Sequence, residues 1–276
     1  MLPPLPIPHI PPPQQCKDLT TAKECWEKAA TGHIAQRSNW HAAKAMERAG
    51  EVARDAKDWP EVGGCYRRAA ELYLEEGRPA QAAEAVATAA RALEDPDPTT
   101  ATKLYAQAIE WVEDGGKEGL SADIYRSAIA HSIRASSWAE AVALLLRFAA
   151  ACLNVNATNS LCKSYLGAVV VWLYAGNANA AWCTYQDALS VTEFSVSQEA
   201  LAAEDMLNGY RAGDRTSIEL VVSRQHCFTH LEPCVARLAK KLPTGGDDEL
   251  HAMALVVGGS GGGGGGGEDG EEEDLT

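Results

Sequence analysis

Alanine recurs along this chain every 19 to 21 residues. The nine alanines of this series are Ala29, Ala49, Ala69, Ala89, Ala108, Ala128, Ala149, Ala168 and Ala188. Three positions before each stands a large apolar or aromatic residue: Trp26, Met46, Tyr66, Val86, Tyr105, Tyr125, Leu146, Tyr165 and Tyr185. Seven positions before each alanine stands a small or aliphatic residue. Because offsets of 3, 4 and 7 residues return to one helix face, each unit predicts one amphipathic helix and a short turn.

Such a helix cannot bury its apolar face alone, so neighbouring units must stack. A small alanine beneath a large ring lets adjacent helices approach closely. Two units form a hairpin of about 40 residues, longer than the roughly 34 of a tetratricopeptide (TPR) repeat. The sequence therefore predicts an all-α, TPR-like superhelical solenoid of antiparallel helical hairpins with a C-terminal helical cap. An irregular helical bundle is the alternative, which nine consecutive matches disfavour.

Glycine, proline and aspartate mark the expected turns between helices. The glycines expected near helix ends are Gly50, Gly77, Gly115, Gly116 and Gly176. Proline costs least in the first turn of a helix, where its missing N–H has no partner anyway. Helix starts are therefore expected at Pro60, Pro79 and Pro98, with Asp58 and Asp97 as N-caps.

Composition divides the chain into four parts. Residues 1–21 form a proline-rich arm expected to be disordered, with seven prolines in Met1–Pro13. The solenoid is expected over residues 22–192 and the cap over residues 193–243, where the period weakens. Residues 244–276 are expected to be a flexible, acidic tail that includes the glycine run Gly258–Gly267.

The net charge of −14 is concentrated at the C-terminal end. Nine acidic residues and no lysine or arginine follow Pro243, which leaves 29 acidic against 24 basic residues in the rest of the chain. A nucleic-acid partner is not expected, because binding phosphates requires a basic surplus. The eight cysteines show no C-x-x-C spacing and no signal peptide precedes them, so we expect free thiols in a cytoplasmic protein. The longest apolar run, Gly167–Ala175, is too short to span a bilayer and predicts a buried helix.

The sequence offers little catalytic chemistry. No nucleophile elbow, HExxH motif or nucleotide-binding fingerprint occurs, so we expect no catalytic residue, no cofactor and no enzyme activity. The best metal-binding candidate is the group His226, Cys227, His230 and Cys234. Packing within the cap is the favoured interpretation of this group, because the spacing is not that of a zinc knuckle.

Three segments of the repeat resemble a known family. WHAAKAMERAGEVA (Trp40–Ala53), CYRRAAELYLEEGRPAQAAEA (Cys65–Ala85) and ATKLYAQAIEWVED (Ala101–Asp114) are similar to the soluble NSF attachment proteins, closest to the gamma form. The resemblance runs from about Thr21 to Pro243 and resumes at the acidic end.

The resemblance implies an adaptor that grips the four-helix SNARE bundle left after membrane fusion and recruits the hexameric ATPase NSF, which disassembles the bundle. It implies a role in vesicle-mediated intracellular protein transport, including transport between ER and Golgi. The expected location is cytoplasmic and peripheral to ER, Golgi, vacuolar or vesicle membranes, with membrane association through the partners. A generic TPR-like scaffold for other protein clients is the alternative.

The resemblance also implies site residues. SNARE bundles present acidic surfaces, so the concave face of the solenoid is expected to carry basic residues. The candidates are Lys103, Lys117, Arg126, Arg134, Arg147 and Lys163. In the family a penultimate leucine stimulates NSF, and the matching residue is Leu275, preceded by Glu272, Glu273 and Asp274.

The sequence departs from the family pattern in three places. The proline-rich arm stands where the family has its first helices and a membrane-contacting apolar loop; a gene-model error and a real loss are both open. The family's acidic cluster for NSF falls on Asn208, Arg211 and Ala212, and only Asp214 nearby is acidic. This contact is therefore weakened or moved to the acids at 247–249. The glycine run before the tail is unusually long.

Overall fold

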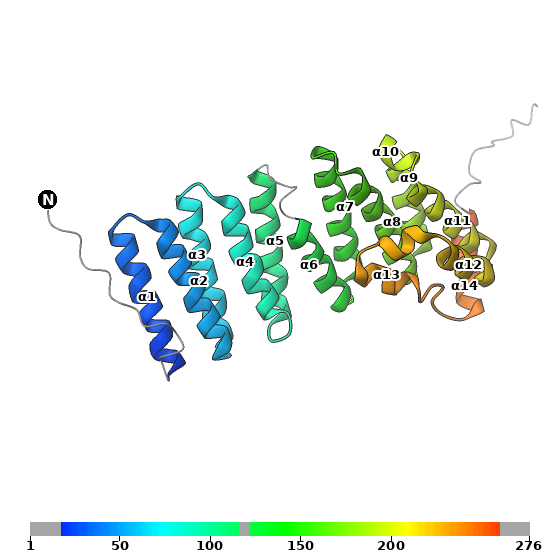
Figure 1. The fold of residues 1–276 in the computed structure, drawn as a ribbon. Coiled ribbons are helices and arrows are strands. Elements are labelled where there is room, and N and C mark those ends of the chain that lie inside the picture. The colour runs from blue at the N-terminus through cyan, green and yellow to red at the C-terminus, as the bar shows by residue number, and fades with distance from the viewer. Residues whose placement is uncertain (1–17, 116–121, 260–276) are drawn as a thin grey trace, which may run out of the picture.

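The computed structural model describes residues 18–115 and 122–259, and within them it is helical without any strand. The solenoid helices are α1 (Leu19–Ala35), α2 (Asn39–Asp55), α3 (Trp59–Glu75), α4 (Pro79–Leu93), α5 (Pro98–Asp114), α6 (Ala122–Arg134), α7 (Trp138–Asn154), α8 (Thr158–Tyr174) and α9 (Ala178–Ala188). Each packs against the next in an antiparallel row (Figure 1). This arrangement confirms the all-α solenoid that the alanine period predicts.

The alanine period defines the core of the row. All nine alanines of the series are at most 2% exposed, and each lies in a different helix from α1 to α9. Their aromatic partners are buried or half-buried, and Tyr125 for example is fully enclosed. The apolar run that begins at Gly167 lies in α8, which is buried on nearly all sides. No helix of the described residues is long and apolar enough to cross a membrane.

The described turns follow the predicted pattern except at Gly50, although Asp58 precedes α3 without a side-chain capping hydrogen bond; Gly116 lies outside the described residues. Gly77 and Gly176 adopt left-handed φ angles of 68° and 78° at helix ends, where the absence of a side chain removes the steric cost. Asp97 caps α5 by accepting a hydrogen bond from the Thr100 N–H at 3.1 Å. Gly50 is the exception, since it lies inside α2 and not at a helix end. A Cβ atom there would lie 2.7 Å from Cε2 of Tyr66, so Gly50 serves close helix packing.

The C-terminal cap covers the end of the row at α8 and α9 (Figure 1). Its elements are α10 (Thr192–Ser195), α11 (Gln198–Ala212), α12 (Arg215–Arg224), the 3₁₀ helix η3 (His226–His230), α13 (Pro233–Ala239) and α14 (Asp247–Gly259). The short helix α13 packs on α8 and η3, whereas α14 packs on α9 and α11.

The prediction that a flexible tail begins at residue 244 is wrong, because residues 247–259 form helix α14. Leu250 is 1% exposed, and Met253 packs against the core beside Gly176. These two apolar side chains are three residues apart on a helix that packs against α9 and α11. The nine acids and many glycines of residues 244–276 dominate the composition from which the tail was predicted. At the other end, α1 begins at Leu19 with Asp18 as its N-cap, inside the segment expected to be a disordered arm. The expected disorder of residues 1–17 and of the glycine run past Gly259 lies outside the described residues.

Candidate protein-interaction surface

The solenoid has two rows of helices, one even-numbered and one odd-numbered, which alternate along the chain. Helix α2 contacts α4 and α4 contacts α6, whereas the described parts of the odd-numbered helices make fewer contacts of this next-but-one kind. These contacts bring the even-numbered helices α2, α4 and α6 together on one side of the solenoid.

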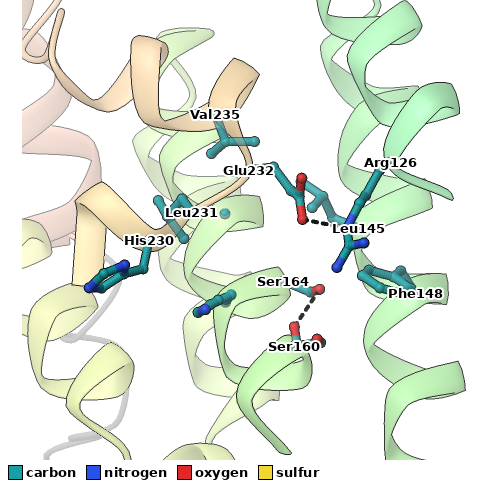
Figure 2. A pocket seen from close by; sticks show the side chains of 11 residues that line it. Arg126, Leu145, Phe148, Ser160, Ser164, His230, Leu231, Glu232 and Val235 are labelled. Carbon is teal, nitrogen blue, oxygen red and sulfur yellow. Dashed lines mark hydrogen bonds and ion pairs between the residues drawn. The ribbon is translucent and has the colours of Figure 1, made fainter. Parts of the chain in front are cut away.

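Arg126 and Lys163 meet at a pocket on the even-numbered side. The pocket has a volume of about 190 Å³ and lies between α6, α7, α8 and the cap. Leu145, Phe148 and Val235 form its apolar wall, as Figure 2 shows. This pocket joins solenoid residues to cap residues that are distant in the sequence.

The Arg126 guanidinium forms an ion pair that links α6 to the cap. Its Nε donates to Oε1 of Glu232, immediately before α13, at 2.8 Å (Figure 2). The guanidinium also pairs with Asp123 in its own helix at 3.1 Å. Lys163 makes no ion pair with any residue in the described ranges and is half-buried in the pocket wall. Of these two candidates, Lys163 is therefore the one whose charge remains available to a partner.

A second hollow of about 400 Å³ adjoins α6 and α13 and contains Arg134. Arg134 pairs with Glu94 at 2.6 Å. Two further arginines line this hollow, Arg91 from α4 and Arg237 from α13. Sequence reasoning missed both. Arg91 could have been found by aligning alternate helices, but nothing in the repeat indicates where the separate helix α13 docks.

The remaining candidates do not belong to this surface. Lys103 is exposed on α5, and Arg147 extends from α7 toward α5, so both lie on odd-numbered helices. Arg147 donates from two nitrogens to the two carboxylate oxygens of Glu113, at 2.7 and 3.2 Å. Lys117 lies outside the described residues. The five candidates within the described residues therefore do not lie on one row, because helices about 20 residues apart alternate between the two rows.

Glu113 is the centre of a polar network that joins three helices. It accepts hydrogen bonds from Arg147 on α7 and from the Tyr125 hydroxyl on α6, while it belongs to α5 itself. Burial raises the pKa of Glu113, whereas the hydrogen bonds from the Arg147 guanidinium and the Tyr125 hydroxyl lower it. The lowering effects together exceed the effect of burial, so the pKa of Glu113 lies below its ordinary value. Arg147 thus has a structural partner within the solenoid.

The cap residues at the family's acidic positions have structural roles. The Arg211 guanidinium stacks over the Trp182 ring, 4.2 Å from its centroid. Asp214 caps α12 and accepts from the Ser217 N–H at 3.2 Å. Arg215 donates to the Gly245 carbonyl at 2.8 Å and so ties the start of α12 to the chain entering α14. The exposed carboxylates at positions 248 and 249 begin α14 near this tie.

The metal candidate of the cap does not form a ligand cluster. His226 and His230 lie in a 3₁₀ helix, whose three residues per turn place positions four apart on different faces. Elsewhere in the described residues Glu27, Glu61 and Cys65 come close enough to share an ion, but Lys23 pairs with both carboxylates at 3.7 and 2.8 Å. Burial raises the pKa of the Cys65 thiol to about 11, so it stays protonated. The seven described cysteines are free; Cys16 lies outside the described residues.

The comparisons with known proteins agree with this architecture. The family model of the soluble NSF attachment proteins matches residues 15–238. A gamma-soluble NSF attachment protein of Arabidopsis thaliana is 38% identical over 224 residues, covering 81% of this chain and 77% of the relative. A protein of the same name from Dictyostelium discoideum is 27% identical over 234 residues, covering 85% of this chain and 72% of the relative. The chain belongs to the soluble NSF attachment protein family.

Proposed function

We propose that this protein holds an assembled SNARE bundle on the concave face of its solenoid, which we assign to the even-numbered helices, while its C-terminal part recruits NSF. Members of this family are adaptors for NSF in SNARE disassembly and vesicle transport, and the chain carries that adaptor role. As an adaptor it acts by binding and not by catalysis. We place it on the cytoplasmic side of ER, Golgi, vacuolar or vesicle membranes, to which its partners attach it.

The observation that carries the surface assignment is the clustering of basic residues from separate elements. We define the even-helix basic surface as Arg91, Arg126, Arg134, Lys163 and Arg237. These residues come from α4, α6, α8 and α13 and line two hollows that both border α6 and α13. Lys163 and Arg237 have no ion-pair partner within the described ranges, so they can attract the acidic side chains of a helical bundle.

The NSF contact is proposed at the corner where α12 and α14 begin. The family's acidic positions hold Asn208, Arg211 and Ala212 here. Exposed carboxylates at Asp248 and Glu249 stand close to this region, because Arg215 ties the two helix starts together. We propose that these carboxylates replace the family's acidic cluster and that the acidic end with Leu275 assists them.

Two lysines of opposite rows provide a matched test of the SNARE surface. Lys163 lies on α8 in the even-numbered row, and Lys103 lies on α5 in the odd-numbered row. We expect Lys163→Glu to weaken co-precipitation of an assembled SNARE bundle by about fivefold or more at low salt, because a surface charge pair is converted into a repulsive one. Lys103→Glu should bind like the wild type. Arg126 is unsuitable for this test, since its loss would release Glu232 and disturb the cap.

Salt provides the second readout. Binding through exposed charges should weaken as salt rises from about 50 to 300 mM, because the Debye length becomes shorter than the distances between the groups. Equal SNARE binding by the two lysine variants, or binding that salt does not change, would contradict the surface assignment. Failure of the wild-type protein to capture both the SNARE bundle and NSF would favour a scaffold for other clients.

A further inference from the structure

Three arginines from three elements converge on the hollow between α4, α6 and α13. Arg91, Arg134 and Arg237 line it together with a single carboxylate, Glu94. Ser127 adds a hydroxyl group to the lining. The hollow is open to solvent and has a volume of about 400 Å³, which is enough for a small polar molecule. The three arginines and one glutamate give the lining of this hollow a net positive charge.

Two of these arginines are held in place by neighbours on the solenoid. The Nε of Arg91 donates to the Ser127 hydroxyl at 3.3 Å, and another of its nitrogens pairs with Glu84 at 2.9 Å. Arg134 pairs with Glu94 at 2.6 Å, and Glu94 also accepts a hydrogen bond from the Tyr105 hydroxyl at 2.7 Å. Both guanidinium groups are thereby oriented while part of each stays exposed to solvent.

Arg237 completes the group from the cap. It is exposed on α13 and forms no ion pair with a residue in the described part of the chain. Two anchored guanidinium groups and one unpaired group therefore face a common space from different sides. Any ligand that contacts all three joins α4 and α6 of the solenoid to α13 of the cap.

Guanidinium groups favour phosphoryl oxygens, because their planar N–H forks match two oxygens at once and their charge does not titrate. We infer that this hollow binds a small ligand that carries several phosphoryl groups, such as an inositol polyphosphate or the headgroup of a phosphoinositide lipid. A polyphosphate offers oxygens in several directions, which suits three arginines that approach from three elements. The inference does not rest on SNARE or NSF binding and is tested without either partner.

The first experiment uses the full chain and soluble inositol hexakisphosphate. Isothermal titration calorimetry should show saturable binding at one site, and the thermal midpoint should rise with ligand concentration because the ligand binds only the folded state. Arg237→Gln should weaken this binding by about tenfold or more, since it removes a charge-assisted, bidentate contact. The variant should melt like the wild type without ligand, because the Arg237 side chain makes no ion pair there.

Arg224→Gln is the matched control. Arg224 is an exposed arginine at the end of α12 and does not line the hollow. It should bind the polyphosphate like the wild type. Absence of saturable binding, or an equal loss in both arginine variants, would overturn the inference, because non-specific attraction to positive charge would then explain the data.

A second arm distinguishes the source of the phosphoryl groups. Vesicles of phosphatidylcholine with and without phosphatidylinositol 4,5-bisphosphate are sedimented with the wild type, Arg237→Gln and Arg224→Gln. Capture that needs the phosphoinositide and is lost only in Arg237→Gln identifies a lipid headgroup. Binding of the soluble polyphosphate alone, with the same pattern among the variants, identifies a free ligand.

Discussion

Gly50 and Gly64 are two helix-interior glycines with opposite surroundings. A Cβ atom at Gly50 would lie 2.7 Å from the Tyr66 ring, and Tyr66 is itself buried at 3% exposure. A Cβ atom at Gly64 would meet nothing within 4 Å. The same residue type thus has two physical roles. Gly50 allows a neighbouring helix to approach closely. Gly64 serves no such contact and only lowers the helix propensity of α3.

We expect Gly50→Ala and Gly64→Ala to change stability in opposite directions. Alanine at position 64 should stabilise the fold by about 0.5–1 kcal/mol, the difference in helix propensity. Alanine at position 50 should destabilise it by about 1–3 kcal/mol, because a buried ring has no room to move away. Urea unfolding of both variants measures the two free energies. Stabilisation by Gly50→Ala would show that the α2–α3 contact is looser than the structure indicates.

At the scale of elements, a left-handed residue recurs at the turns between helices. At two turns this residue is a glycine, as expected: Gly77 and Gly176. At four other turns a residue with a side chain adopts the same conformation, with φ angles from 57° to 60°: Arg37, Lys57, Ser136 and Asn156. A side chain in this region is sterically unfavourable by about 1–2 kcal/mol. The solenoid therefore tolerates strain at these four turns, since the long buried helices on either side determine where the chain must reverse.

Exchange of the turn residues tests this strain. Lys57→Gly should stabilise the protein by up to about 1 kcal/mol, because relief of the left-handed strain outweighs the added chain entropy of glycine. Gly77→Lys should destabilise it by a similar amount at the equivalent position of the next turn. Thermal denaturation of both single variants is the measurement. If Lys57→Gly lowers the midpoint, the turn is not strained.

Hydrogen bonds from Tyr125 and Arg147 to Glu113 connect the three helices α5, α6 and α7. The pKa of Glu113 lies below its ordinary value, so ionised Glu113 stabilises the folded state above the pKa that this group has when unfolded. That contribution is lost as the pH falls through the folded-state pKa. Glu113→Gln should therefore be less stable than the wild type at pH 7, and the difference should shrink between about pH 5 and pH 3. Urea unfolding across this range checks the sign, and a difference that grows on acidification would refute it.

For the whole molecule, the solenoid and cap form one continuous structure joined by contacts that are distant in sequence. The Arg126–Glu232 pair connects α6 to the cap across 106 positions. The cap thereby contributes Arg237 to the basic surface and places α14 at the far end of the row. The residues after Gly259, including the acidic end, lie outside the described residues, so the role of Leu275 remains a prediction from the sequence.

We expect Leu275→Ala to leave folding and SNARE binding unchanged but to lower stimulation of the NSF ATPase several-fold. A lone leucine among acidic residues cannot form a core of its own, so it acts in a pocket of a partner. Burial of one leucine is worth roughly 1.5–3 kcal/mol, enough to bias a partner that the body already holds. The ATPase rate at saturating SNARE bundle is the measurement. Thr276→Ala is the control at the adjacent position, and equal rates in all three proteins would make the acidic end merely solubilising.

The sequence by itself determined the number, type and approximate ends of the solenoid helices. A period near 20 residues with offsets of 3, 4 and 7 is local information, so the buried alanines and the helix N-termini at Pro79 and Pro98 could be predicted from it. The family was also visible in contiguous segments of the repeat. Helix α14 does not follow from the repeat, because its seven apolar residues lie between three acids and the glycine run, outside the 20-residue period, and packing on α9 and α11 decides its conformation.

Only the tertiary structure decided which charges share a surface. A repeat specifies that helices alternate between two rows, but the position of a basic residue in the middle of the solenoid does not determine its row. The structure places Lys103 and Arg147 on odd-numbered helices, whereas Arg126, Arg134 and Lys163 lie on even-numbered helices. The docking of α13 then added Arg237 through contacts between segments far apart in sequence. Core burial follows local periodicity, whereas a binding surface depends on which distant elements meet, because no local pattern encodes that meeting.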